Sequence, residues 1–232
     1  MAFLTARLLE VLQMGDTIGG ILDLPQASLP SPGQYLPVQP LEGQSEVLTL
    51  PLFRVVGPAG LLVLGPIPSS WSPGDRIACL SPQGNGYHLP KSARRIALLG
   101  MDGQPLRVLP LAEQALRQNA AVSLFFMEPP NREIMGWLPS SVEVNHISEL
   151  SENLDWPDFL AVEMDQDNLP ALNALLENPP PGLSGQVLVR TAMPCRGLGA
   201  CGVCAVKTRH GWRQACTDGP VFALKELLHV AE

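Results

Sequence analysis

The sequence predicts an α+β chain of three units: a β-barrel or sandwich, an open parallel α/β sheet and a cysteine-rich tail. The first ninety residues contain short extended stretches between proline- and glycine-rich turns, a pattern typical of barrels and sandwiches. From about Ala93 onward, extended stretches alternate with helical ones, which predicts an open, mainly parallel sheet. Four of the five cysteines follow residue 191. We therefore expect units at residues 1–91, 92–191 and 192–232.

The first unit contains five stretches with strand character, residues 20–24, 34–38, 46–56, 61–64 and 76–80. The segment before them is ambiguous. Leu4, Leu8, Val11 and Leu12 recur at helical spacing, so hydrophobic periodicity alone predicts a helix there.

The second unit has five expected strands, residues 95–100, 121–127, 142–145, 158–163 and 186–191. Helices are expected over residues 105–118 and 168–177, and Pro110 should kink or interrupt the first. In the tail we expect a hairpin of residues 205–208 and 212–215, followed by a helix over residues 221–230.

Composition excludes several classes of protein. Hydrophobic residues make up 46% and charged residues 16%, which argues against a disordered chain. The net charge of −7 argues against nucleic acid as a partner. No apolar run approaches the roughly 20 residues that span a bilayer, and the N-terminus lacks the features of a secretion signal. We expect a cytoplasmic protein without a membrane span.

The tail cysteines are arranged as C-x5-C-x2-C-x11-C, formed by Cys195, Cys201, Cys204 and Cys216. This pattern differs by one residue from the C-x4-C-x2-C run of plant-type [2Fe–2S] proteins. A structural zinc site also uses four cysteines, but usually as two C-x2-C pairs, and only one such pair is present. The spacing favours an iron–sulfur cluster, with zinc as the alternative. Cys79 stands apart and is expected to be an ordinary buried residue.

The tail resembles a known family in residues 193–204 and in the run Cys-Thr-Asp-Gly-Pro-Val-Phe that begins at Cys216. Both segments resemble the iron–sulfur segment of dihydroorotate dehydrogenase electron-transfer subunits, members of the ferredoxin–NADP reductase superfamily. The resemblance implies an FAD-binding antiparallel barrel, a nucleotide-binding α/β domain and a [2Fe–2S] tail. It also implies that the N-terminal segment is a strand and that the four tail cysteines are the cluster ligands.

The flavin and nucleotide motifs of that family are altered here. By resemblance, Arg54 and the loop glycines Gly84 and Gly86 would contact FAD. The flavin signature Arg-Pro-x-Ser/Thr should fall within residues 50–56, where the chain reads Leu-Pro-Leu-Phe-Arg-Val-Val. In the nucleotide loop, residues 100–105, Met101 adds bulk and Asp102 places a negative charge where phosphates would lie.

We therefore expect an electron-transfer subunit of an oxidoreductase complex, without catalytic side chains of its own. Its [2Fe–2S] cluster would carry electrons between a reduced donor, in the family NAD(P)H through FAD, and a partner flavoprotein resembling dihydroorotate dehydrogenase. That enzyme would link the chain to pyrimidine biosynthesis in a hetero-oligomer. The alternatives are a docking subunit with structural zinc and a complete reductase that keeps FAD.

Overall fold

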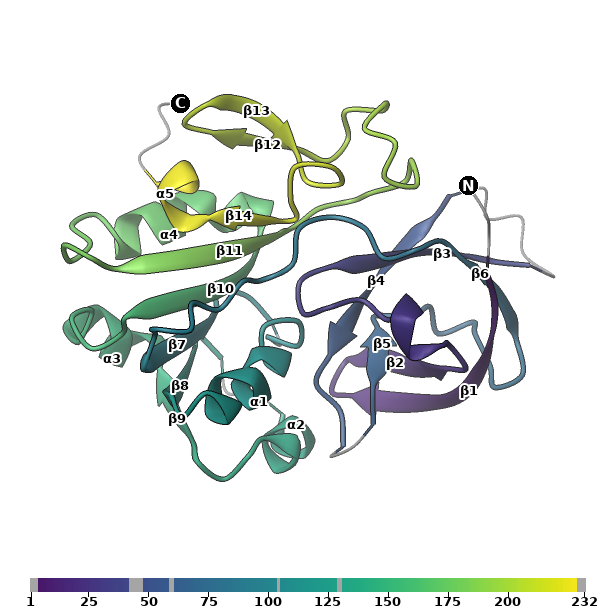
Figure 1. Cartoon of the computed structure of the whole chain (residues 1–232), viewed down its shortest axis with the longest axis horizontal. Coiled ribbons are helices and arrows are strands. Elements are labelled where there is room, and N and C mark those ends of the chain that lie inside the picture. The colour runs from purple at the N-terminus through teal and green to yellow at the C-terminus, as the bar shows by residue number, and fades with distance from the viewer. Residues whose placement is uncertain (1–3, 42–47, 59–60, 104, 129–130, 229–232) are drawn as a thin grey trace.

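The computed structural model describes residues 4–41, 48–58, 61–103, 105–128 and 131–228. Its N-terminal part is a closed antiparallel barrel whose strands follow the order β1-β2-β5-β4-β3-β6 (Figure 1). The strands are β1 (Leu4–Met14), β2 (Thr17–Leu22), β3 (Tyr35–Pro40), β4 (Leu50–Val55), β5 (Val63–Gly65) and β6 (Arg76–Cys79), with a short 3₁₀ helix, η1 (Gln26–Ser28), after β2.

The ambiguous N-terminal segment is a strand. β1 pairs with β2 along one edge and with β6 along the other. Ala6 and Leu8 are buried, whereas Thr5 and Arg7 are exposed, which is the alternation of a strand with one buried face. The helical spacing is therefore misleading: of the four residues that show it, only Leu8 is buried, and Leu4 is 37% exposed.

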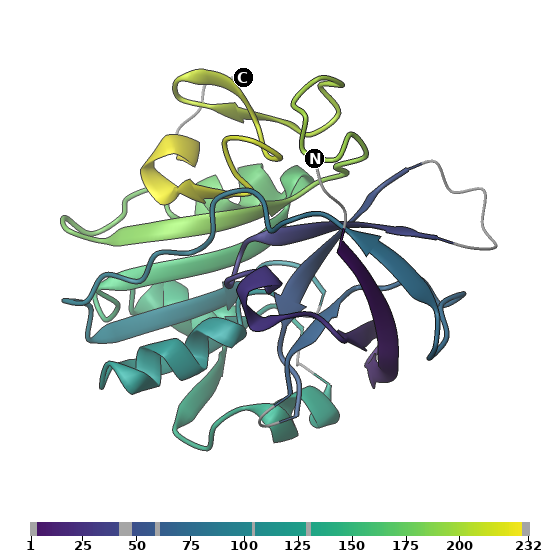
Figure 2. The same cartoon turned by 45° about the vertical axis from the view of Figure 1, so that its right-hand side comes forward.

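The central part is a six-stranded sheet in the order β14-β11-β10-β7-β8-β9, parallel except for β14. Helix α1 lies in front of this sheet and α4 behind it (Figures 1 and 2). The strands are β7 (Arg95–Gly100), β8 (Ala121–Phe126), β9 (Val142–His146), β10 (Phe159–Asp165), β11 (Ser184–Arg190) and β14 (Val221–Ala223). The helices are α1 (Pro110–Arg117), α2 (Arg132–Trp137), α3 (Ile147–Glu152), η2 (Gln166–Asn168), α4 (Leu169–Leu175) and α5 (Leu224–Leu227). The predicted barrel and parallel sheet are thus confirmed.

Some elements differ from the prediction. Pro110 begins α1 instead of kinking it, because the first helical position needs no backbone N–H. The segment expected as one helix over residues 221–230 starts as the edge strand β14 and turns into α5 only at Leu224. The periodicity did not predict α2 and α3, which are six residues each. Residues 46–47 and 229–230 of the predicted elements lie outside the described residues.

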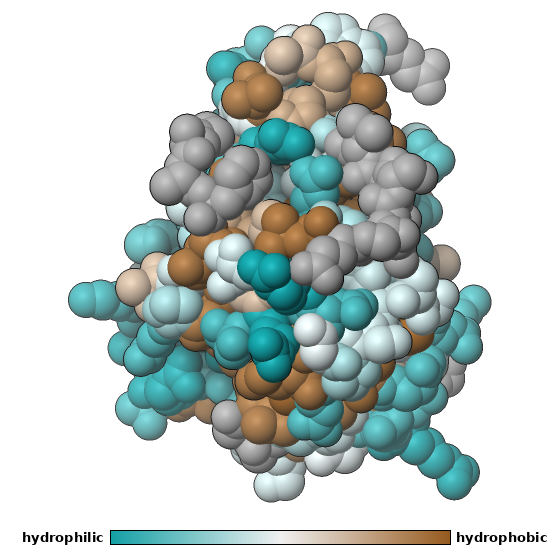
Figure 3. Space-filling view, turned by 90° about the vertical axis from the view of Figure 1, so that its right-hand side faces the viewer, coloured by the Kyte–Doolittle hydropathy of each residue, from teal (hydrophilic) through white to brown (hydrophobic). Residues whose placement is uncertain are grey.

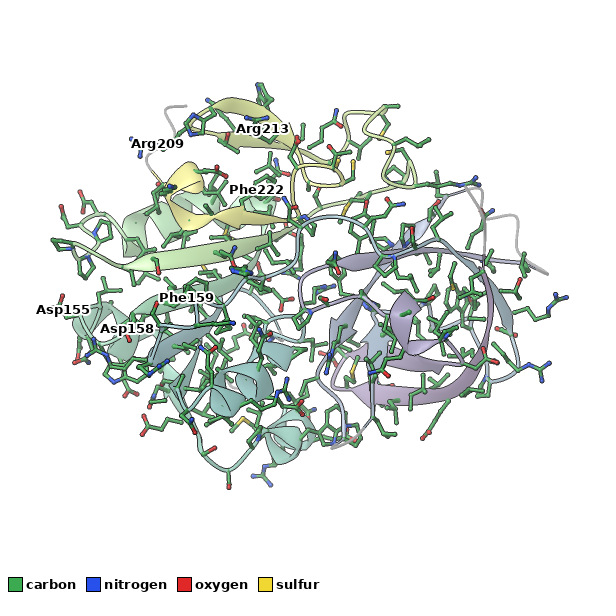
Figure 4. The ribbon with its side chains drawn as sticks, viewed as in Figure 1. Asp155, Asp158, Phe159, Arg209, Arg213 and Phe222 are labelled. Carbon is green, nitrogen blue, oxygen red and sulfur yellow. The ribbon has the colours of Figure 1, made fainter. Side chains whose placement is uncertain are left out.

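The barrel and the sheet share one hydrophobic core. The guanidinium of Arg107 lies 5.1 Å from the centroid of the Phe53 ring on β4. The backbone N–H of Val56 donates to the carbonyl of Leu106 at 3.1 Å. These contacts place the loop between β7 and α1 against the barrel, so the carboxyl ends of the parallel strands face it. Figure 4 shows Asp158 and Phe159, at the opposite end of β10, far from the barrel.

Within the described part of the chain, no helix has the length and apolar character that crossing a membrane requires.

Leu98→Ala should lower the free energy of unfolding by about 2–5 kcal/mol, because Leu98 is fully buried in the central strand β7 and its loss leaves a cavity. Leu9→Ala is the matched control, since Leu9 is 52% exposed on β1 and its loss should change stability by less than about 0.5 kcal/mol. Urea unfolding followed by circular dichroism measures both. Equal losses in the two variants would contradict this description of the core.

Candidate metal centre

The tail folds around a hairpin of β12 (Ala205–Thr208) and β13 (Gly211–Gln214). Cys204 precedes β12, and Cys216 follows β13 by two residues. The backbone N–H of Ala215 donates to the carbonyl of Cys204 at 2.9 Å and closes the base of the hairpin. The hairpin therefore brings the third and fourth cysteines together although 11 residues separate them in the sequence.

The loop that carries the first three cysteines bends back on itself. Arg196, Gly197, Gly199 and Gly202 all have positive φ angles, between 59° and 75°. At Gly199 the φ angle of 67° is one that favours glycine. A loop of this kind can direct its backbone N–H groups inward, toward the sulfurs.

The four thiols lie near enough to influence one another's ionisation. Cys201 lowers the pKa of Cys195, whereas Cys204 and Cys195 both raise the pKa of Cys216. The backbone N–H of Gly199 lowers the pKa of both Cys195 and Cys216. None of the four is in a disulfide. The described residues contain no compact group of three or more His, Cys, Asp or Glu side chains suited to a single metal ion.

The thiols of Cys195 and Cys216 differ in their surroundings. Burial by itself raises the pKa of Cys195, but hydrogen bonds from the Cys201 thiol and three loop amides lower it to about 7. At Cys216, burial and then the hydrogen bond and charge of Cys204 raise the pKa to about 12. A metal cation would compensate the negative charge that disfavours the thiolate form at Cys216. The donor set, four thiols with amides directed at them, fits an iron–sulfur cluster.

The barrel supports the tail through Tyr35 on β3. Its buried hydroxyl donates to the carbonyl of Cys216 at 3.0 Å and lies 3.2 Å from the Oε1 of Gln83. Burial raises the pKa of Tyr35 well above its usual range, and negative charge on three of the four thiols raises it further. Asn85 of the neighbouring loop donates through its side chain to the carbonyl of Asp218 at 2.6 Å. Sequence analysis did not identify Tyr35 as part of the site, although it lies in the expected strand of residues 34–38.

One side of the centre is open. Cys201 is exposed, whereas Cys204 and Cys216 are buried. Leu198 and Val203, on either side of Cys201, are 62% and 54% exposed. Figure 3 shows apolar side chains on the part of the molecule that stands above the barrel, which is the tail in Figure 1. The loop therefore presents an apolar rim around its most accessible thiol.

The residues predicted to contact FAD do not share one hollow. Arg54 lines a small hollow with Leu109 and Glu113 of the α1 region. Gly84 and Gly86 line another with Asp218 and Glu226, between the barrel loop and the tail. A Cβ on Gly84 would lie 2.6 Å from the Cδ of Pro220, so this loop is packed against the tail.

Cys79 is buried in the barrel core, as expected, away from the tail cysteines. Its thiol lies 3.7 Å from the carbonyl of Ile77, and burial raises its pKa to about 12.

Comparison with known proteins agrees with this geometry. Residues 191–228 match the family model described as the iron–sulfur cluster binding domain of dihydroorotate dehydrogenase B. The resemblance predicted from the tail is confirmed. Over 233 aligned positions, the chain is 26% identical to the curated "Dihydroorotate dehydrogenase B (NAD(+)), electron transfer subunit" of Desulforamulus reducens, covering 84% of this chain and 86% of that protein.

Solved structures with ferredoxin reductase folds are similar to this chain. An NADH-dependent reduced ferredoxin-NADP oxidoreductase structure has a TM-score of 0.74 at 16% identity, covering 95% of this chain and 88% of that one. The ferredoxin reductase in carbazole 1,9a-dioxygenase has a TM-score of 0.61 at 14% identity, covering 79% and 68%. The predicted ferredoxin reductase-like fold is therefore confirmed.

In metal-free protein, iodoacetamide should alkylate Cys195 much faster than Cys216 at pH 7–8, because only the thiolate reacts. The rate at Cys195 should rise with pH and level off above about 7, its pKa, whereas the rate at Cys216 should keep rising toward about pH 12. Cys79, whose pKa is also raised to about 12, is the control. Peptide mass spectrometry measures each site; equal rates at Cys195 and Cys216 at pH 7 would contradict the described surroundings.

Proposed function

We propose that this chain is an electron-transfer subunit that carries electrons, one at a time, through a [2Fe–2S] cluster bound by Cys195, Cys201, Cys204 and Cys216. The cluster would exchange them with a catalytic flavoprotein such as a dihydroorotate dehydrogenase. The observation that carries the proposal is the gathering of the four thiols in the positive-φ loop and at the base of the β12–β13 hairpin. In this proposal residues 1–91, 92–191 and 192–232 are the three functional units.

The cysteine spacing supports a dinuclear cluster over a zinc ion. It differs by one residue in the first gap from the plant-type [2Fe–2S] run. A structural zinc ion is usually held by two C-x2-C pairs, and only Cys201 and Cys204 form such a pair here. When bound, the cluster supplies reversible one-electron chemistry. The chain's own contribution is to hold the four sulfurs, to exclude water from Cys204 and Cys216, and to donate hydrogen bonds from backbone amides to the sulfurs.

The amides also bear on the reduction potential. The N–H groups of Leu198, Gly199 and Ala200 all donate to the Cys195 thiol. Because reduction adds negative charge to the cluster and its ligands, donors to sulfur stabilise the reduced state more than the oxidised one. We therefore infer that the loop raises the reduction potential of the cluster.

The proposal of a catalytic partner rests on the similarity to a curated electron transfer subunit and on the exposed apolar rim around Cys201. The Desulforamulus reducens relative is described as an electron transfer subunit, which supports a hetero-oligomer with a catalytic subunit. Leu198 and Val203 flank the exposed Cys201. Apolar side chains around the most accessible cluster ligand would let a partner exclude water from the path of the electron.

The proposal does not place FAD on Arg54, Gly84 and Gly86. These residues line two separate hollows, one beside α1 and one beside the tail.

Anaerobically purified protein should be brown and contain about two irons and two acid-labile sulfides per chain. One-electron reduction by dithionite should give an EPR signal of one unpaired spin per cluster. Metal analysis by mass spectrometry, together with absorption and EPR spectra, measures this. About one zinc per chain in colourless anaerobic protein would falsify the proposal in favour of a structural zinc site.

Cys216→Ser should remove most of the visible absorption and lower the iron content severalfold, because one of the two buried sulfurs, those of Cys204 and Cys216, is lost. Cys79→Ser is the matched control, since Cys79 is equally buried but lies in the barrel core. That variant should keep its iron and its spectrum. Far-UV circular dichroism confirms that both variants fold. Intact absorption in Cys216→Ser, or its loss in Cys79→Ser, would refute the ligand assignment.

A further inference from the structure

The topology of the sheet indicates where a nucleotide would bind. The chain runs from β7 outward through β8 to β9, and then returns to the other side of β7 with β10. The order therefore reverses between β7 and β10. In open α/β sheets, ligands bind in the crevice beyond the carboxyl ends of the strands at such a reversal.

Glu163, the fifth residue of β10, fills this crevice from within. Its side chain is completely buried. One carboxylate oxygen accepts the backbone N–H groups of Arg107 and Val108, at 2.6 and 3.0 Å. The other accepts the guanidinium of Arg107 at 2.7 Å. Two backbone N–H groups ahead of a helix, together with an arginine, are the donors that a phosphate group uses.

Asp102, which follows β7, closes the rest of the crevice. Its carboxylate accepts the backbone N–H of Asp165 and the side-chain amide of Asn168, both at 2.6 Å. It also forms an ion pair with Arg190 at the end of β11. Its carboxylate thus ties together the ends of β10, β11 and η2.

Pro105 lies directly against the end of β7. A Cβ on Gly100 would lie 2.5 Å from the Cβ of Pro105, so there is no room for a larger residue at Gly100. Met101 is buried as well, and its backbone N–H donates to the carbonyl of Glu163 at 3.1 Å. The two backbone N–H groups ahead of α1 that would face a pyrophosphate are therefore covered and already bound by Glu163, whereas the buried Nε atoms of Arg107 and Arg190 have no hydrogen-bond partner among the described residues.

We propose that Glu163 and Asp102 occupy the dinucleotide crevice of this fold, so that the chain does not bind NAD(P)H and receives electrons from a reduced protein partner. The inference about the electron donor rests on the proposed electron-transfer function. The inference that the crevice is closed is independent of that function, because it follows from the contacts around Glu163 and Asp102 alone.

The first test uses the purified chain, prepared anaerobically with its metal centre intact. NADH, NADPH and ADP-ribose, each at about 1 mM, should leave its melting temperature unchanged. A ligand with a dissociation constant of about 10 µM would raise it by roughly 5–10 °C under these conditions. NADH should also fail to bleach the visible absorption of the cluster, whereas dithionite should bleach it. A saturable rise in melting temperature with any of the three ligands would overturn the proposal.

These outcomes separate the two proposals. Brown protein that binds NADH would refute the closed crevice and leave the cluster in place. Colourless zinc protein that binds no nucleotide would refute electron transfer and leave the closed crevice in place.

The second test removes the carboxylate. Glu163→Ala deletes the four atoms that acetate could replace, so the variant should melt at a lower temperature, and about 100 mM acetate should restore part of the loss relative to chloride at equal ionic strength. Asp158→Ala is the matched control. Asp158 also accepts two backbone N–H groups, from Arg94 and Arg95, and pairs with an arginine. However, its side chain is 33% exposed and it lies at the far end of the sheet (Figure 4).

Acetate should not raise the melting temperature of the Asp158→Ala variant, because water already reaches the donors there. An equal effect of acetate on both variants would contradict an enclosed anion site at Glu163. Should Glu163→Ala fail to fold, the nucleotide titration of the unmodified chain decides the proposal on its own.

Discussion

The hydrogen bond at the base of the β12–β13 hairpin is the constraint on which the metal centre depends. It joins the carbonyl of Cys204 to the N–H of Ala215, and so places Cys216 beside Cys204. β14 follows directly and pairs with β11, which anchors this end of the tail to the sheet. Tyr35 anchors the same point to the barrel. The buried pair of thiols is therefore held by rigid elements on both sides, whereas Cys195 and Cys201 depend on the loop.

The carboxylates at the two ends of the parallel sheet differ in their exposure to water. At the amino end, Asp158 accepts its hydrogen bonds in partial contact with water. At the carboxyl end, Glu163 and Asp102 satisfy backbone donors inside the protein, next to the cation of Arg107 over Phe53. Removing one partner of such a buried network leaves an uncompensated charge, which costs several kcal/mol. The network therefore stabilises the contact between barrel and sheet in the same place where a reductase of this fold would need an opening.

The order of units and the four tail cysteines could be predicted from the sequence because their signals are local. Strand and helix patterns alternate along the chain, and three of the cysteines lie within ten residues. Hydrophobic periodicity misassigned β1 because the strand is half exposed and its leucines face both sides. The supports of the site could not be predicted, because they join distant residues: Tyr35 and Cys216 are 181 positions apart, and Glu163 and Arg107 are 56 apart. Asp102 was recognised as unfavourable for phosphates, but its partners in the fold could not be inferred.

Iron K-edge X-ray absorption of the anaerobic protein tests the central claim most directly, because it reports which atoms surround the metal. The account predicts iron in a shell made only of sulfur, together with a second iron at short distance, as a [2Fe–2S] cluster on four cysteine thiolates requires. An iron site with no neighbouring iron would contradict it, and so would the absence of iron with zinc in a four-sulfur shell.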